Sequence, residues 1–240
     1  MEQFIYRIEN LSTDESGRKQ VVIDGDEQFH LSRVLRVRTG EKILATDGNG
    51  STLLCSVLKI SRDAAVCDVL EEYRDMNRAP REYLIGIALL RPMSKMELAL
   101  EKCTELGAGG FILFDSERSD RVRPRLERLE GIIRSAVKQS LRSRIPRLQY
   151  VESLSKAVEG SAHFEEKIVL HEKSKDSLAA RLQATAEKKS VAALVGPEGG
   201  FSENEVEFLA GMGYISLSLG SARLRSETAA IAVSSVLSEY

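Results

Sequence analysis

The sequence is poor in the residues that build metal-linked or disulfide-linked scaffolds. Its three cysteines, Cys55, Cys67 and Cys103, lie far apart among 240 residues, with no CxxC pair and no histidine at ligand spacing. This spacing argues against a zinc site and against a disulfide framework, and it favours reduced thiols. We therefore expect no metal.

Long apolar runs and an excess of one charge are also lacking. No stretch approaches the roughly 20 apolar residues of a membrane span, and the first residues, MEQFIYRIENL, lack the apolar core of a signal peptide. We expect no membrane association and a cytoplasmic location. Because 34 basic and 36 acidic residues give a net charge of -2, any surface for nucleic acid has to be local.

Two different sequence patterns divide the chain into two regions. Residues 1–73 read as short strands and turns, with a hairpin signal at Asp47-Gly48-Asn49-Gly50, and predict a small β-barrel-like domain. Residues 74–82 are polar and carry Pro80, as a linker would. From residue 83 to residue 240, apolar strands alternate with amphipathic helices.

This alternation predicts an α/β domain with a mostly parallel sheet covered on both faces. We expect a capping box at Ser94 and Glu97 before a helix that stops at Gly107, and a second box at Ser202 and Glu205. A further helix should begin at Pro124. The expected strands span residues 83–90, 110–114, 167–172, 191–195 and 215–219.

A glycine-rich loop, Gly196-Pro197-Glu198-Gly199-Gly200, joins an expected strand to a capped helix. It lacks the lysine of the Walker A loop and the glycine spacing of the dinucleotide fingerprint. The carboxylate of Glu198 would also repel a phosphate. The loop favours a neutral or cationic ligand such as S-adenosylmethionine, although a plain glycine turn with Glu198 in solvent fits equally well.

A second motif, LGSARLRSETAA, follows the last expected strand. The strand ends at Gly220, a loop carries Arg223 and Arg225, and Glu227-Thr228 opens the final helix. In an open α/β sheet, ligands collect at the carboxyl ends of the strands. Both motifs, together with residues 170–172, lie at such ends.

GPEGGFSENEVEFL followed by LGSARLRSETAAIAV resembles the RsmE family of 16S ribosomal RNA uridine-N3 methyltransferases, in the SPOUT superfamily. The segments KMELALEKCTELG, SERSDRVRPR, SAVKQSLRSRIPRL and HLSRVLRVRTGEKI agree with it, so the resemblance covers nearly the whole chain. The family usually reads LGxRILRxETA, whereas Ala222 and Arg223 stand here where Arg and Ile are expected.

The resemblance implies a PUA-like N-terminal β-barrel, a trefoil-knotted SPOUT domain of the α/β class, a homodimer and S-adenosylmethionine as the cofactor. It assigns the cofactor to three loops. The residues expected to bind it are Leu170, His171, Glu172, Gly196, Pro197, Glu198, Gly199, Leu217, Leu219, Gly220, Leu224, Arg225 and Thr228.

Methyl transfer to uridine N3 is easier when N3 is an anion, which a nearby cation favours. We expect Arg225 to supply that charge. Glu227 is a second catalytic candidate, either as a base or by holding Arg225. Favourable interaction with the helix dipole is the alternative reading of Glu227.

Basic residues gather in three segments that could contact the phosphates of 16S ribosomal RNA in the small subunit. Aromatic residues, which stack on bases, make up only 5% of the chain. We therefore expect the protein to recognise mainly the RNA backbone and the shape of the RNA. Alternatively, the basic residues of the helical segment could form an ordinary solvent-exposed helix face with no RNA contact. The candidates are Arg33, Arg36, Arg118, Arg121, Arg123, Lys138, Arg142 and Arg144.

Two other functions stay open at this point. The chain could methylate a different RNA position, or it could be a catalytically silent protein that binds RNA during ribosome assembly. The residues do not distinguish free RNA from the assembled subunit as the substrate.

Overall fold

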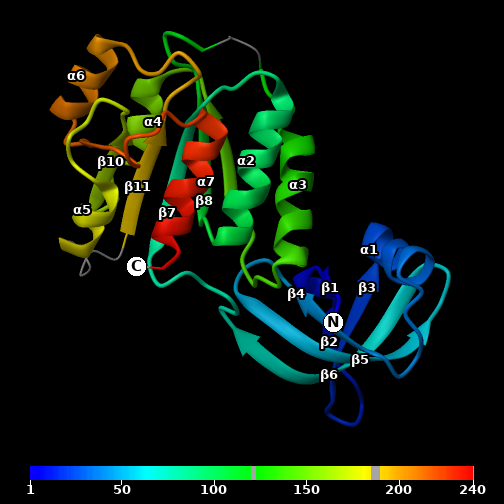
Figure 1. Ribbon diagram of the computed structural model, residues 1–240. Coiled ribbons are helices and arrows are strands. Elements are labelled where there is room, and N and C mark those ends of the chain that lie inside the picture. Colours follow the sequence, from blue (N-terminus) through cyan, green and yellow to red (C-terminus); the bar gives the residue numbers. More distant parts are fainter. Residues whose placement is uncertain (120–122, 185–189, 240) are drawn as a thin grey trace. The chain divides into compact units, whose positions relative to one another are not determined.

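The computed structural model describes residues 1–119, 123–184 and 190–239, which fold as two compact units (Figure 1). The first unit contains Met1–Arg78 and Val137–Ile145, and the second contains Ala79–Ala136 and Pro146–Tyr240. The chain thus passes from the first unit to the second at Arg78 and returns briefly later. The domain bounds expected from the sequence stay a prediction.

The first unit is built on a six-stranded sheet in the order β1-β4-β5-β6-β3-β2. All neighbouring strands are antiparallel except β1 and β4. The predicted hairpin is confirmed, since Asp47 accepts hydrogen bonds from the backbone N–H groups of Asn49 and Ser51 in the turn. The elements of the unit are β1 Gln3–Ile5, η1 Ile8–Asn10, β2 Leu11–Thr13, β3 Lys19–Asp24, α1 Gly25–Phe29, η2 His30–Val34, β4 Lys42–Thr46, β5 Ser51–Ile60 and β6 Ala64–Arg74.

Residues 137–145 belong to the first unit because their polar groups are satisfied there. The Ser143 hydroxyl lies 2.8 Å from the hydroxyl of Thr52, and Gln3 donates to the Arg142 carbonyl at 2.8 Å. These hydrogen bonds join residues about a hundred positions apart. Sequence periodicity carries no information about such contacts.

The second unit contains a six-stranded, fully parallel sheet in the order β12-β10-β11-β7-β8-β9. The predicted parallel sheet is confirmed. One strand, β9, was not foreseen because it lies at the sheet edge, where its side chains are only partly buried and its sequence RLQYV lacks a continuous apolar run. The strands are β7 Glu82–Ala88, β8 Gly110–Phe114, β9 Arg147–Val151, β10 Glu166–Leu170, β11 Ser190–Val195 and β12 Ile215–Leu217.

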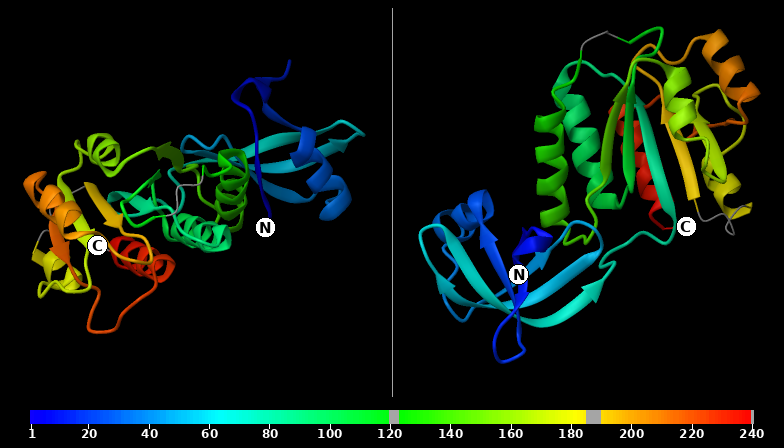
Figure 2. Two further views of the ribbon diagram at one scale, coloured as in Figure 1. Left: turned by 90° about the horizontal axis from the view of Figure 1, so that it is seen from above. Right: turned by 180° about the vertical axis from the view of Figure 1, so that it is seen from behind.

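Helices cover both faces of this sheet. Ala88, Phe114 and Leu194 share one core with residues of α4 and α6, while α7 packs against α2, β7 and β11. Figure 1 shows α2 and α7 side by side, and Figure 2 gives the view from above. The helices are α2 Met93–Leu106, α3 Leu126–Gln139, α4 Leu154–Gly160, α5 Leu178–Ala184, α6 Glu203–Gly211 and α7 Ser226–Leu237.

The helix ends test the capping predictions. The box at Ser202 and Glu205 is present in full, and Gly107 ends α2 with a left-handed φ of 108°. The box at Ser94 is wrong, because α2 already begins at Met93, with Pro92 in the N-cap position, so Ser94 lies inside the helix. Pro92 provides the extended backbone that an N-cap needs, with φ -66° and ψ 162°.

The three cysteines are free and buried. Burial raises the pKa of each thiol to about 12. The thiols are therefore protonated at neutral pH and serve as small apolar side chains rather than as nucleophiles. Among the described residues, no helix has the length and apolar character needed to cross a membrane.

Candidate functional site

Three loops at the carboxyl ends of β10, β11 and β12 enclose a pocket of about 170 Å³. The loops come together because these strands are parallel neighbours and therefore end at the same edge of the sheet. All the residues expected to bind the cofactor line this pocket except Arg225 and Thr228. The sequence motifs thus mark one concave surface.

The glycine loop after β11 is a tight turn in which glycine is needed. Gly200 donates its N–H to the Pro197 carbonyl at 2.8 Å and has a φ of 67°, which disfavours other residues. A β-carbon at Gly196 would lie 3.1 Å from the ring of Phe201. The loop therefore presents its backbone to the pocket.

Glu198 braces this loop against the start of α2. Its carboxylate accepts hydrogen bonds from the Lys95 ammonium at 3.0 Å and from the Arg91 N–H at 3.3 Å. Burial alone would raise the pKa of Glu198, but these hydrogen bonds outweigh it and hold the pKa below its ordinary value. Since Lys95 partly neutralises Glu198, the repulsion expected between this carboxylate and a phosphate is reduced.

The ion pair between Glu198 and Lys95 predicts a pH-dependent stability. A carboxyl whose folded-state pKa is lowered stabilises the protein above its ordinary pKa of 4.5, and this stabilisation is lost as the pH falls through the lowered value. We expect Lys95→Met to lower the free energy of unfolding at pH 7 by up to about 1 kcal/mol and by less at pH 3. Denaturant titrations at both pH values measure the difference, with Lys95→Arg as the control. An equal effect at both pH values would contradict this role.

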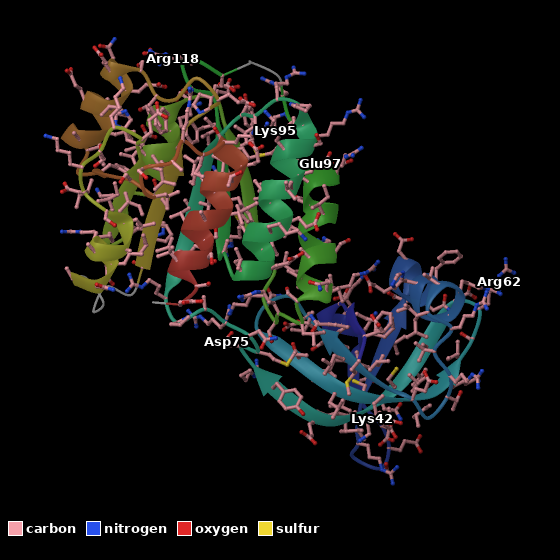
Figure 3. The ribbon with its side chains drawn as sticks, in the orientation of Figure 1. Lys42, Arg62, Asp75, Lys95, Glu97 and Arg118 are labelled. Carbon is pink, nitrogen blue, oxygen red and sulfur yellow. The ribbon has the colours of Figure 1, made fainter. Side chains whose placement is uncertain are left out.

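Arg118 is a second side chain that holds the glycine loop, and its expected contact with RNA stays a prediction. Its guanidinium donates to the Gly199 carbonyl at 2.9 Å and lies 3.5 Å from the Phe201 carbonyl. Arg118 also lines the pocket. Figure 3 labels Arg118 and Lys95, which come from different segments of the second unit.

Glu205 ties the segment after β8 to the start of α6. One carboxylate oxygen accepts from the Ser116 hydroxyl at 2.8 Å and from the Glu117 N–H at 3.0 Å. The other oxygen accepts from the Ser202 N–H at 2.8 Å, which completes the capping box. This buried carboxylate thus fixes Ser116 and Glu117 relative to the helix that follows the glycine loop.

Replacing Glu205 tests this arrangement. In Glu205→Gln, an amide NH₂ group replaces one carboxylate oxygen and faces a hydrogen-bond donor instead of accepting from it. Because this leaves buried polar groups unpaired, we expect the free energy of unfolding to fall by about 1–3 kcal/mol. Glu203 lies in the same helical turn but is exposed, so Glu203→Gln serves as the matched control and should change stability by less than about 0.5 kcal/mol. Equal stability of the two variants in urea titrations would refute the role of Glu205.

The loop after β12 carries Arg223, one of the two residues that depart from the family motif. The Arg223 guanidinium lies 3.4 Å from the Glu172 carboxylate, so this arginine links the loops that follow β12 and β10. Both side chains are largely exposed, and the pair contributes little stability. Gly220, with a φ of 125°, gives the loop its turn.

The two catalytic candidates occupy different environments. Arg225 is exposed at the N-cap position of α7, and its side chain does not cap the helix. Glu227 is buried in the first turn, and one of its carboxylate oxygens has no hydrogen-bond partner. Within the described part of the chain, the two side chains form no ion pair with each other, so Glu227 does not hold Arg225 in this structure.

Comparison with known proteins gives a consistent assignment. Residues 77–238 match the RNA methyltransferase domain, and residues 23–70 match the RNA methyltransferase PUA domain. The ribosomal RNA small subunit methyltransferase E of Bacillus subtilis is 30% identical over 227 residues, which cover 90% of this chain and 88% of that protein. The chain belongs to the ribosomal RNA small subunit methyltransferase E family. The Mycobacterium tuberculosis member is 34% identical over 220 residues, covering 87% and 82% of the two chains.

Solved structures of this family share the fold. The ribosomal RNA small subunit methyltransferase E of Neisseria gonorrhoeae, bound to S-adenosyl methionine, superimposes with a TM-score of 0.85 at 26% identity and covers 99% of this chain and 96% of its own. A Legionella pneumophila methyltransferase in complex with the same cofactor gives 0.83 at 25% identity, with the same coverage of both chains. The family resemblance and the PUA-like, mixed α/β fold expected from the sequence are confirmed.

The residues expected to contact RNA are distributed over both units, and their role stays a prediction. Lys138 pairs with Glu27 at 2.8 Å and Arg144 with Asp75 at 2.6 Å, while Arg142 donates to the carbonyl of Asn77. These three side chains therefore also hold the first unit together. Three other candidates are exposed, and Arg121 lies outside the described residues. The exposed ones are Arg33, Arg36 and Arg123.

The sequence interpretation missed several residues that line the pocket or support its loops. Lys95 and the Phe201 ring support the glycine loop, and Lys173 lines the pocket. Only the position of Lys95 in the first turn after an expected strand could have indicated its role. The others became apparent once the loops were placed together.

Proposed function

We propose that this protein transfers a methyl group from S-adenosylmethionine to N3 of a uridine in 16S ribosomal RNA of the small subunit. The observation that carries the proposal is the pocket at the carboxyl ends of β10, β11 and β12, lined by loops that the family motifs mark independently. Related proteins whose structures contain S-adenosylmethionine share this fold.

The pocket wall carries both signs of charge, with carboxylates that can interact with a sulfonium. Arg118 and Arg223 line the pocket, but backbone carbonyls and Glu172 engage their guanidinium groups. Glu172 and Glu198 bring carboxylates to its wall. Apolar surface for the adenosine comes from Leu170, Leu217, Leu219 and Leu224.

S-adenosylmethionine supplies a methyl group on a positively charged sulfur, and an in-line displacement passes it to the attacking nitrogen. The protein has mainly to position the reactants and manage charge. We assign to Arg225, which is exposed at the start of α7, the role of favouring the N3 anion of the bound base. The N3 proton leaves to solvent before the nitrogen attacks, the N–C bond forms as the C–S bond breaks, and S-adenosylhomocysteine is the leaving group. Glu227 stays a secondary candidate because one buried oxygen still has hydrogen-bonding capacity.

We extend the proposal to the assembly and to the path of the chain. The family resemblance implies a homodimer and a trefoil knot, and we propose both for this chain. The last helix, α7, follows the edge strand β12 but packs on α2, β7 and β11, as a chain that folds back on itself would require. For the RNA, Arg33 and Arg36 offer exposed cations in the first unit, and Arg123 offers one in the second. The substrate places this activity in the cytoplasm.

The proposal is tested by methyl transfer in vitro. Small ribosomal subunits lacking the modification are incubated with labelled S-adenosylmethionine and the purified protein, and label in 16S RNA is counted against subunits that already carry it. We expect label only in the unmodified subunits. Calorimetry that shows cofactor binding without transfer would favour the silent RNA-binding alternative, and an absence of binding would refute the proposal.

A further inference from the structure

A second, larger cavity lies at the carboxyl ends of β8 and β9, and the proposed chemistry does not use it. It is a groove of about 720 Å³ in the second unit, bounded by residues 115–117, by residues 150–155 and by the start of α6. It shares no lining residue with the cofactor pocket. Glu117 lines the groove and Arg118 lines the pocket, so the two cavities lie on either side of one short segment.

The groove has an apolar, partly aromatic side. Phe208 on α6 is 39% exposed, although it is large and apolar. The ring of Tyr150 and the side chain of Leu154 line the groove as well. Exposed rings of this kind suit stacking with a flat, unsaturated ligand.

Most of the acidic groups in the groove are already engaged. One oxygen of Asp115 accepts a hydrogen bond from the Tyr150 hydroxyl at 3.1 Å, while its other, buried oxygen has no hydrogen-bond partner. Glu152 pairs with Arg123 at 3.2 Å. The carboxylate of Glu205 is saturated by internal donors. Glu117 differs from these, since among the described residues its exposed carboxylate makes no hydrogen bond or ion pair.

The combination of an exposed ring and an available carboxylate defines the ligand. A carboxylate repels phosphate but accepts hydrogen bonds from the exocyclic amino groups of bases. Uracil has no amino group, so this groove does not select the base that is methylated. Arg123, exposed at the rim, can contact the backbone of the same strand.

We propose that this groove binds a second nucleobase of the RNA substrate, an unpaired adenine, cytosine or guanine near the methylated uridine. The base stacks on Phe208 and donates its amino group to Glu117. This inference rests on the proposed function for the identity of the RNA. It adds a contact that selects the sequence or shape around the target nucleotide.

Crosslinking from position 208 tests the proposal. A photoreactive benzoylphenylalanine replaces Phe208 in the full chain, which is irradiated with unmodified small subunits, and crosslinked nucleotides are mapped by reverse transcription. We expect a crosslink to an amino-bearing base other than the methylated uridine. Met212 lies at the end of the same helix, is 44% exposed and does not line the groove, so the same replacement there is the control.

A kinetic readout accompanies the crosslink. Phe208→Ala should raise the KM for small subunits about tenfold, as expected for the loss of one stacked base, and should leave the Kd for S-adenosylmethionine unchanged. Met212→Ala should change neither value. An unchanged KM in Phe208→Ala, a crosslink to a ribosomal protein or to the target uridine, or no crosslink above the Met212 control would overturn the proposal. Crosslinking needs no turnover, so the groove is tested even if the proposed methyl transfer fails.

Discussion

Arg225→Ala should lose most of the methyl transfer activity while it still binds S-adenosylmethionine. The guanidinium is exposed at the start of α7 and does not line the cofactor pocket, so its removal should change neither the fold nor the pocket. The charge that favours the N3 anion would be missing. Because removing one group that stabilises developing negative charge costs about 10²- to 10³-fold in rate, we expect kcat to fall by that factor.

Two measurements separate this role from a structural one. Calorimetry should give a Kd for the cofactor within about twofold of the wild type, since Arg225 makes no contact with the pocket. Arg225→Lys keeps the charge and should recover part of kcat. Full activity in Arg225→Ala would end the assignment, and a large loss of cofactor affinity would move Arg225 from the substrate to the cofactor.

Gly199→Val should weaken cofactor binding by narrowing the pocket. A β-carbon at this position would lie 3.4 Å from Arg118, an ordinary contact that the fold tolerates. The branched γ-carbons of valine extend further and compete with the ligand for a pocket of about 170 Å³. Overpacking a tight site costs about 1–3 kcal/mol, which corresponds to an increase in Kd of about 5- to 150-fold.

Gly199→Ala is the matched control for the valine variant. It adds only the β-carbon and should raise Kd much less, so the two variants form a graded series. Thermal unfolding of each variant checks that the second unit is intact. Equal, wild-type affinity in both variants would show that the loop is a turn with no part in ligand binding.

The sequence predicted correctly those strands and helix ends whose structure depends on neighbouring residues. The strands β8 and β11 are continuous apolar runs, and Gly107 and the Ser202–Glu205 box end or begin helices by local chemistry. The candidate pocket followed from one topological rule, that parallel strands end together. Predicting these features requires only the neighbouring residues or the direction of the strands.

The features that sequence reading missed depend on contacts between distant segments. Glu198 looked like a free carboxylate until Lys95, about a hundred residues earlier, was placed against it. The hydrogen bond from Arg118 to the Gly199 carbonyl was not foreseen because it joins residues 81 positions apart. The false capping box at Ser94 arose because the pattern ignores Pro92, which takes the N-cap position two residues earlier.

The most direct test of the account is the identity of the methylated atom. Unmodified small subunits are incubated with the protein and S-adenosylmethionine, and the 16S RNA is digested and analysed by mass spectrometry against nucleoside standards. We predict one N3-methyluridine at a single position, formed about 10²- to 10³-fold more slowly when Arg225→Ala replaces the wild type. A methyl group on another atom or base would contradict the assignment of the reaction, and unmethylated RNA in the presence of bound cofactor would contradict enzymatic activity on this substrate.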